Sequence, residues 1–495
     1  MRYVSTRDKD ARGVSSAYAI KTGLAHDKGL FMPEHIPTIT LEEIESLIPM
    51  SYPERAAYVL SKHLDDYSKE ELLEDAEGAY SEEKFRSFPA KITEMNDGNF
   101  MLELWHGPTC AFKDMALQIM PRLFARALRK CGEDRCALIL VATSGDTGKA
   151  ALEGYRDVDG TKVKVFYPID GVSRVQKLQM QTQTGKNVSV TGIRGNFDDA
   201  QTGVKRIFAD TEYSDLLDKE GVFLSSANSI NWGRLVPQIV YYVSAYCDMV
   251  KCGAVKLGEK IDVCVPTGNF GNIFACYLAK LMGLPVEKLI CASNENNVLT
   301  EFLTSGVYDR NRAFHTTMSP SMDILISSNL ERLLYVTLGP EKTAEYMAKL
   351  DKDGRYALTD EDFAYISKDF LGYSASEEET AKTIKSTYEN KNCLIDPHTA
   401  VAMYATEQYR KDNEAERRIL TVSTACAYKF AADVYASLTG NKPTDELKAL
   451  DMLMELTAEP IPSPLEGLGS KEALHTSVID KTEMKDSVSI FAKNS

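Results

Sequence analysis

The spacing of hydrophobic residues differs between the first 95 residues and the rest of this chain. Residues 1–95 are rich in polar, helix-period patterns, for example over 41–48 and 68–75. After the turn signal Asn96-Asp-Gly98, short apolar runs that predict strands alternate with helix-period patterns. The predicted strands lie at 100–104, 137–142, 163–167, 188–191, 261–265, 289–292 and 418–422. The predicted helices include 114–130, a helix from Lys149, 198–208 and one that ends near Leu281.

This alternation favours parallel sheets with helices on both faces, which is an α/β fold. Ligands of such sheets bind beyond the carboxyl ends of the strands. From Pro460 the chain is first rich in Pro, Gly and Ser and then loses its periodicity. We therefore expect the last residues to form a peripheral extension.

Composition narrows the classes of function. The chain has 495 residues, enough for two to four domains, and a net charge of −15. That charge argues against nucleic acid or an anionic membrane as a main partner. We find no membrane-spanning run, no signal-peptide pattern and no metal-ligand spacing. The ten scattered cysteines form no CxxC pair, so we expect reduced thiols in a cytoplasmic protein.

Lys113 is the first candidate for chemistry. It follows Phe112, between a Gly-Pro turn and an apolar helical pattern. Such surroundings lower the pKa of an amine by desolvation, and a neutral amine can attack an aldehyde to form a Schiff base. Lys113 therefore suggests a pyridoxal-phosphate enzyme. The alternative for a single lysine, and the more common case, is a solvated helix residue.

Two strand–glycine loop–helix units predict anion sites. They are Thr143-Ser-Gly-Asp-Thr-Gly148 and Pro266-Thr-Gly-Asn-Phe-Gly-Asn272. Glycine lets backbone N–H groups approach an anion, and the helix that follows adds partial positive charge. Together the loops suggest a cofactor phosphate and a substrate anion. Asp146 would repel phosphate, so we expect it to cap the helix or to orient neighbouring donors. Each loop alone could be an ordinary βα turn.

Two further segments carry suitable donors. Residues 225–234 place Ser and Asn side chains before Arg234, which can bind a carboxylate or phosphate through two bonds. Residues 422–430 place Thr424 directly after a predicted strand, where its hydroxyl could face a ring nitrogen. Either segment could instead be a capped helix start. Neither a GxxxxGK[ST] nor a GxGxxG loop occurs, so nucleotide binding has no support.

Five motifs in order resemble the threonine synthase family, in the branch shared by many bacteria and fungi. They are HGPTCAFKD (106–114), SGDTG (144–148), SANSIN (226–231), PTGNFGN (266–272) and STACAYKF (423–430). Residues 319–332 also resemble it, and the likeness extends from the first residues to about residue 435. It implies the tryptophan synthase β-like fold of pyridoxal-phosphate enzymes, with parallel sheets flanked by helices and an N-terminal, mostly helical region. We expect four regions: the N-terminal region at 1–95, a large cofactor-binding α/β domain at 96–136 and 231–459, a small α/β domain at 137–230, and a C-terminal extension at 460–495.

The resemblance implies roles for residues that match the motifs. Lys113 matches the lysine that forms the Schiff base with pyridoxal 5'-phosphate, and Thr424 matches the hydroxyl that faces the pyridine nitrogen. The match to the cofactor-phosphate loop covers Gly268, Asn269, Phe270, Gly271 and Asn272. The candidates for substrate contacts are Ser144, Asp146, Thr147, Asn228 and Arg234. This chain departs from the family at Cys426 and Ala427, which replace a His-Pro or Ser-Pro pair and would loosen the turn after Thr424.

The implied function is the last step of threonine biosynthesis. O-phospho-L-homoserine and water would give L-threonine and phosphate by γ-elimination and β-addition, which makes the enzyme a carbon–oxygen lyase acting on phosphates. We expect a small-molecule substrate as the only partner and a monomer or small homo-oligomer. One alternative is a related phospho-lyase that releases 2-oxobutyrate and ammonia. Another is a non-catalytic anion-binding module.

Overall fold

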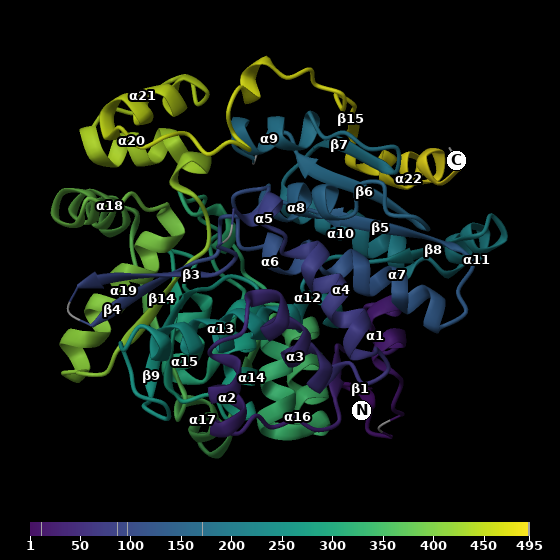
Figure 1. Cartoon of the computed structure of the whole chain (residues 1–495). Coiled ribbons are helices and arrows are strands. Elements are labelled where there is room, and N and C mark those ends of the chain that lie inside the picture. The colour runs from purple at the N-terminus through teal and green to yellow at the C-terminus, as the bar shows by residue number, and fades with distance from the viewer. Residues whose placement is uncertain (11, 87, 97, 171, 494–495) are drawn as a thin grey trace.

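Two mostly parallel sheets organise the molecule (Figure 1). The structure is a computed structural model, and it describes residues 1–10, 12–86, 88–96, 98–170 and 172–493. Within those residues the larger sheet has the strand order β13-β10-β9-β14-β4-β3 and the smaller sheet the order β15-β7-β6-β5-β8. The larger sheet contains β3 (Lys91–Asn96), β4 (Asn99–Glu103), β9 (Ile261–Pro266), β10 (Val286–Ser293), β13 (Phe370–Ser374) and β14 (Ile419–Ser423). The smaller sheet contains β5 (Cys136–Ala142), β6 (Thr161–Pro168), β7 (Val188–Arg194), β8 (Val222–Ser225) and β15 (Val478–Asp480).

All neighbouring strands of both sheets run parallel except β3, which pairs antiparallel with β4. The near-continuous apolar sequence of β5 and β9 has a clear reason, because strands covered by helices on both faces bury both sets of side chains. The α/β fold expected from the sequence is thereby confirmed.

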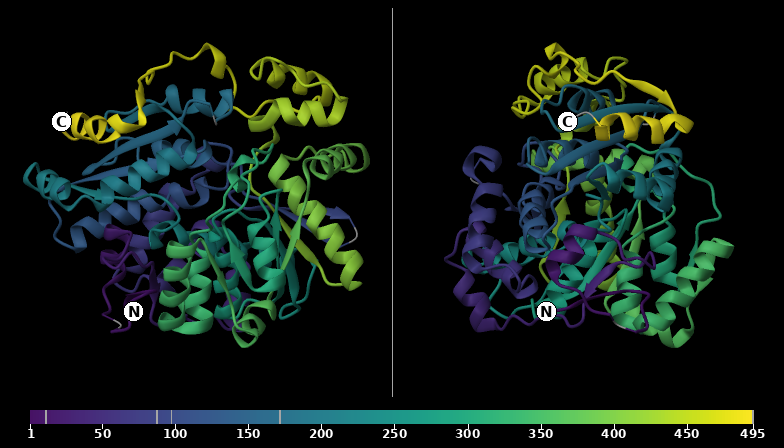
Figure 2. Two further views of the ribbon diagram at one scale, coloured as in Figure 1. Left: turned by 180° about the vertical axis from the view of Figure 1, so that it is seen from behind. Right: turned by 90° about the vertical axis from the view of Figure 1, so that its right-hand side faces the viewer.

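Helices cover both faces of the larger sheet (Figures 1 and 2). The apolar side chains of α19 pack against Cys264 and Ile290 on one face. On the other face, Val263 and Leu289 share a core with Phe274 of α14. The helices around this sheet are α13 (Pro237–Lys251), α14 (Gly271–Met282), α15 (Val298–Ser305), α16 (Leu330–Asp353), α17 (Asp360–Ser367), α18 (Glu377–Lys391), α19 (Pro397–Asn413), α20 (Ala431–Thr439) and α21 (Lys448–Thr457).

The smaller sheet is covered in the same way. Val163 and Val165 pack with Ala151 of α8 on one face, and Leu138 packs with Val204 of α10 on the other. The helices at this sheet are α8 (Asp146–Gly154), α9 (Arg174–Gln181), α10 (Phe197–Ala209), α11 (Thr211–Lys219) and α22 (Met484–Lys493).

The N-terminal region wraps around the helices between the two sheets (Figure 1). It contains β1 (Tyr3–Ser5), α1 (Ser16–Thr22), β2 (Phe31–Pro33), α2 (Leu41–Leu47), α3 (Tyr52–His63), α4 (Lys69–Ala79) and α5 (Glu82–Phe85). Ser51 and Ser68 begin α3 and α4 with capping boxes, which explains why these polar-rich segments form helices. Among the described residues, no helix is long and apolar enough to cross a membrane.

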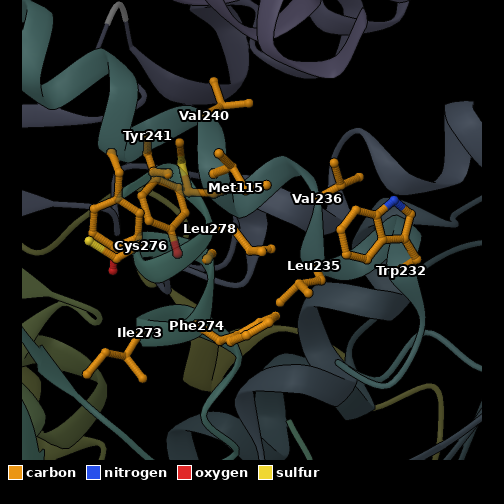
Figure 3. Packing of buried hydrophobic residues seen from close by; sticks show 14 of the residues in the cluster. Met115, Trp232, Leu235, Val236, Val240, Tyr241, Ile273, Phe274, Cys276 and Leu278 are labelled. Carbon is orange, nitrogen blue, oxygen red and sulfur yellow. The ribbon is translucent and has the colours of Figure 1, made fainter. Parts of the chain in front are cut away.

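Figure 3 shows part of one continuous hydrophobic core, to which helices that begin near the candidate site contribute side chains. Met115, Trp232, Tyr241, Phe274 and Leu278 meet there, and all are fully buried. They come from α6 (Asp114–Leu117), α12 (Trp232–Leu235), α13 and α14. Each buried aromatic side chain removes a large apolar area from water. This packing therefore fixes the helix starts next to Lys113, Arg234 and the loop at 268–272.

The helix predicted over 114–130 is two helices, α6 and α7 (Met120–Lys130). Pro121 explains the break, because it has no N–H to bond to the carbonyl of Leu117 four residues earlier. Gly154 of α8 lies against that carbonyl so closely that a Cβ there would be 1.9 Å from the oxygen. The break thus lets α8 approach the lysine segment.

Residues 460–493 contribute more to the fold than we expected from their lack of a regular hydrophobic pattern. β15 pairs with β7, and α22 places Met484 and Val488 in the core of the smaller sheet. A three-residue strand is too short to show an alternating pattern, so the sequence carried little sign of it. The division of the chain into four regions stays a prediction.

Candidate active site

Lys113 lies between the two sheets at the start of α6. Its segment pairs with the segment after β14 through a bridge between Ala111 and Ala425. Phe112 N–H donates to the Thr424 carbonyl at 2.8 Å, and Cys426 N–H donates to the Cys110 carbonyl at 3.1 Å. The second bond holds the turn after Thr424 without the proline that the family often has. This pairing places Lys113 and Thr424 on adjacent stretches of backbone.

The Lys113 amine is buried, with 8% of the residue exposed. Its Nζ donates to Asp146 Oδ2 and to Ser321 Oγ, both at 3.1 Å. Burial lowers the pKa of the Lys113 amine, and the nearby charge of Asp146 offsets part of that effect. The desolvated lysine predicted from the sequence is confirmed, and its Nζ has two partners that fix its position.

Asp146 is the most tightly held carboxylate near Lys113. Its Oδ1 accepts hydrogen bonds from Lys429 Nζ and Gln176 Nε2, both at 2.7 Å. Burial alone would raise the pKa of Asp146, but the charges of Lys113 and Lys429 hold it well below its usual range. Of the two roles expected for Asp146, capping is wrong, because α8 has Gly145 as its N-cap and Asp146 makes no capping bond. The contacts of Asp146 agree with the other role, which is to orient neighbouring donors.

The loop at 268–272 is shaped by close backbone contacts. A Cβ on Gly268 would lie 2.6 Å from the Ser321 carbonyl oxygen, and Phe270 has a left-handed backbone with φ of 60°. The Gly268 carbonyl accepts from Ser327 Oγ at 2.7 Å, and the Asn269 carbonyl accepts from Asn329 N at 3.1 Å. These bonds engage the carbonyl groups of the loop with protein donors.

The same loop fits the phosphate of a cofactor. α14 begins at Gly271, so the unpaired N–H groups of its first turn face the loop. Asn272 Oδ1 accepts from the hydroxyls of Tyr241 and Tyr242, while its Nδ2 is buried and has no partner in the described part of the chain. A buried unpaired donor is costly unless a ligand accepts from it. The donors therefore match a phosphate.

Thr424 directly follows β14 and is 6% exposed. Its carbonyl is occupied by Phe112 N–H, which fixes the backbone and leaves the side-chain hydroxyl as the group that can act on a ligand. Its role at a ring nitrogen stays a prediction.

The predicted substrate contacts divide into two groups. Ser144 and Thr147 flank Asp146 at the start of α8. Thr143 Oγ1 shapes this turn by accepting from the N–H groups of Gly145 and Gly148, both at 2.9 Å. This role of Thr143 was not predicted from the sequence.

Arg234 and Asn228 form the second group. Arg234 is 4% exposed and donates to the Ala227 carbonyl at 3.0 Å. Burial lowers the pKa of Arg234 to about 10. Its Nε and the Asn228 Oδ1 are buried and lack hydrogen-bond partners within the described residues. A buried guanidinium with a free donor near Lys113 suits an anionic substrate.

Sequence reasoning did not assign Lys429, Ser321, Gln176 or His398 to the site. Lys429 and Ser321 lie inside segments that carried the resemblance, so the motifs contained a signal. Nothing in the local pattern at 176 or 398 marked those residues. Only the fold brings these four side chains to the partners of Lys113.

Comparisons with known proteins agree with this geometry. The profile described as "Threonine synthase N terminus" matches residues 2–80, and the one described as "Pyridoxal-phosphate dependent enzyme" matches residues 96–425. A threonine synthase from Pseudomonas aeruginosa is 39% identical over 90% of this chain and 92% of its own length. Human threonine synthase-like 1 is also 39% identical, over 94% of this chain, but the chain spans only 62% of that protein.

The solved structures include a close match over the full length. The pyridoxal-phosphate-bound threonine synthase from Brucella melitensis superposes with a TM-score of 0.87 and 35% identity, covering 100% of both chains. The likeness therefore extends beyond the site to the whole fold.

Proposed function

The chain belongs to the threonine synthase family of pyridoxal-phosphate-dependent enzymes, and from this premise we propose that it converts O-phospho-L-homoserine and water to L-threonine and phosphate. It would thus act as a carbon–oxygen lyase on a phosphate ester, in the last step of threonine biosynthesis. All ten cysteines are free, which fits the reducing cytoplasm where we propose that it acts.

The single observation that carries this proposal is the position of Lys113. Its Nζ is buried between Asp146 and Ser321, and Ser321 also touches the glycine loop. We propose that Lys113 binds the cofactor aldehyde and that the loop from Gly268 to Asn272 holds the cofactor phosphate. When bound, pyridoxal phosphate supplies an aldehyde for the substrate amine and a sink for the electrons left when protons are removed.

Once freed by the substrate amine, the Lys113 Nζ is the best-placed base for the proton on the α-carbon. Burial lowers the pKa of this amine, which is the direction that a base at this position requires. In the proposed reaction, protons leave the α- and β-carbons as the γ-carbon–oxygen bond breaks and phosphate departs. A proton is then added at the γ-carbon, the hydroxyl of water adds at the β-carbon, and a proton returns to the α-carbon. Asp146 and Ser321 would orient the Lys113 amine for these proton transfers.

We propose that the remaining candidate residues bind and orient the substrate and the cofactor. Arg234 has an unused buried donor, Nε, suited to the anionic groups of the substrate, whereas the unpaired Asn228 Oδ1 is an acceptor and would meet a donor group of the ligand. Ser144 and Thr147 lie close to Asp146 in the chain. Thr424 offers a neutral hydroxyl to the ring nitrogen, which would leave that nitrogen largely unprotonated and favour elimination over transamination. Lys429 keeps Asp146 paired when Lys113 is engaged elsewhere.

A specific observation keeps a second outcome in view. Human threonine synthase-like 1 is as similar in identity as the bacterial threonine synthase. A phospho-lyase outcome would use the same residues up to the loss of phosphate. It would then release 2-oxobutyrate and ammonia instead of adding water at the β-carbon.

The test is to identify the products by mass after incubating the holoenzyme with O-phospho-L-homoserine. We expect one threonine for each phosphate released. Phosphate with 2-oxobutyrate and ammonia would assign the phospho-lyase reaction instead. Protein that binds no cofactor and releases no phosphate would support a non-catalytic module.

A further inference from the structure

Asp396 is a fully buried carboxylate that begins α19, outside the groups assigned above. Its Oδ2 accepts from the backbone N–H of His398 at 3.0 Å and from His398 Nδ1 at 2.7 Å. Its Oδ1 accepts from the backbone N–H of Thr399 at 3.2 Å and from Thr399 Oγ1. An ionised carboxylate has about four acceptor positions, so Asp396 uses all of them on these two residues. The helix cap thereby orients two neighbouring side chains.

The first arm of this arrangement runs through His398. Its Nε2 accepts from the Ser321 backbone N–H at 3.1 Å, while its Nδ1 faces Asp396. These partners are satisfied together only by the neutral tautomer that carries its proton on Nδ1. His398 therefore connects Asp396 to the backbone of Ser321.

Ser321 carries this constraint to Lys113 and to the loop. Its Oγ accepts from Lys113 Nζ at 3.1 Å and donates to Asp146 Oδ2 at 3.3 Å. Its carbonyl lies where a Cβ on Gly268 would be 2.6 Å away. A shift of the Ser321 backbone would thus move a partner of Lys113 and one wall of the loop at once.

The second arm runs through Thr399 to the segment that carries Thr424. Thr399 Oγ1 lies 2.9 Å from Ser423 Oγ, which also accepts from Trp105 Nε1 at 3.0 Å. A hydroxyl has one proton, and Thr399 gives its proton to Asp396. Ser423 must therefore donate to Thr399, which sets the direction of the whole chain of hydrogen bonds. Ser423 directly precedes Thr424.

We propose that Asp396 is a positioning residue that aligns two groups of the cofactor site, with Lys113 held through His398 and Ser321, and Thr424 held through Thr399 and Ser423. This inference rests on the proposed function for the identity of the ligand that the two groups would contact. No residue of either arm touches the reacting atoms, except that Ser321 contacts Lys113. Partners that orient the ligands of a metal site change affinity or activity about 10–100-fold when lost, and we expect an effect of that order here.

Paired variants of His398 and Thr399 test each arm. They keep the hydrogen bonds from the backbone N–H groups of these residues to Asp396. His398→Phe retains a ring against Phe430 but removes the acceptor, whereas His398→Gln keeps an acceptor near the place of Nε2. Thr399→Val removes only the hydroxyl, and Thr399→Ser keeps it. Thr359→Ala, which removes the cap of the distant helix α17, controls for cap loss in general.

The first readouts need no substrate. In apoprotein labelled with ¹⁵N-histidine, His398 should give the signals of the Nδ1-protonated tautomer. His398→Phe should weaken binding of pyridoxal phosphate about 10-fold or more, with most of the loss recovered in His398→Gln. Thr399→Val should shift the absorption band of the bound cofactor, and Thr399→Ser should restore it. Thr359→Ala should change neither readout.

Other results overturn the proposal. An Nε2-protonated or doubly protonated His398 contradicts the first arm. Unchanged cofactor affinity and absorption in both His398→Phe and Thr399→Val, with lower thermal stability alone, would reduce Asp396 to a helix cap. Because these measurements use cofactor without substrate, they stand whether the product is threonine or 2-oxobutyrate.

Discussion

The two glycine loops look alike in sequence but differ in the charge that they present. The unit at 143–148 begins its helix with a buried carboxylate, Asp146, which contacts two lysines and a glutamine. The unit at 266–272 presents glycine backbone, the start of α14 and the unpaired amide of Asn272. The same βα geometry can therefore hold cations or accept an anion, and the side chain at the helix start decides which.

The largest effect on activity is expected when Lys113, the lysine that contacts Asp146, is replaced. Lys113→Ala should abolish the covalent cofactor absorption and reduce turnover of O-phospho-L-homoserine to background, because the variant lacks the amine proposed to bind the cofactor aldehyde. Absorption spectra and phosphate release measure both effects. Lys130→Ala, on the surface of α7, should retain both. Phosphate release at the native rate by Lys113→Ala would remove Lys113 from the mechanism.

Replacing the carboxylate should make the first unit more like the second. Asp146→Asn leaves the buried Lys429 without its negative partner, so we expect a loss of about 3–5 kcal/mol in the free energy of unfolding at neutral pH. Urea denaturation measures this loss. Equal stability of variant and native protein at neutral pH would contradict the buried ion pairs.

The stability difference between the native protein and Asp146→Asn should depend on pH. The folded pKa of Asp146 lies well below its usual range, so its contribution is present above the unfolded value of about 3.9. It is lost as the pH falls through the folded value. The stability gap between native protein and Asp146→Asn should therefore be widest near neutral pH and should narrow in acid. A gap that widens in acid would reverse the assigned sign.

Adding a methyl group at Gly268 tests the close packing of the loop at 266–272. In Gly268→Ala the new Cβ would meet the Ser321 carbonyl at 2.6 Å, so the loop or Ser321 must move. We expect a loss of about 1–3 kcal/mol in stability. We also expect weaker cofactor binding, measured by fluorescence titration. Gly469→Ala is the matched control, because its Cβ would meet only the end of the Leu447 side chain at 3.3 Å. Equal cofactor affinity in both variants would show that the loop does not need this close approach.

The smallest effect is expected at Gln176. Gln176→Leu removes one neutral hydrogen-bond donor from Asp146 and leaves both lysines in place. The expected loss is about 1 kcal/mol in stability with cofactor binding retained. Thermal unfolding and absorption spectra check the two parts. Loss of the cofactor band would mean that Gln176 contributes more than one bond.

Much of the fold could be read from the sequence where the pattern was long. The apolar runs at 137–142 and 261–265 became β5 and β9, because strands buried on both faces need continuous apolar sequence. The break between α6 and α7 was missed, although Pro121 was visible, because the apolar spacing continued across it. β15 was missed because it is three residues long and is held by β7 rather than by its own pattern.

The candidate site divides in the same way. Lys113 and the loop at 268–272 carry local signals, since a lysine beside a Gly-Pro turn and a glycine loop before a helix have recognisable chemistry. For Asp146 the sequence left two roles open, and the structure contradicts capping but agrees with the orientation of neighbouring donors. Lys429, a partner of Asp146, is 283 positions away in the printed sequence, so no local pattern could pair them.

By itself the sequence determined the α/β class and the family resemblance, and it predicted a cofactor-binding lysine at 113 and a phosphate loop at 268–272. These depend on residue types at short spacing, which set local backbone geometry and donor chemistry. Only the tertiary structure decided which charges meet at Lys113 and how Ser321, His398 and Asp396 connect to it. Those contacts join segments that are far apart along the chain, and their energies exist only after the core has brought the segments together and excluded water.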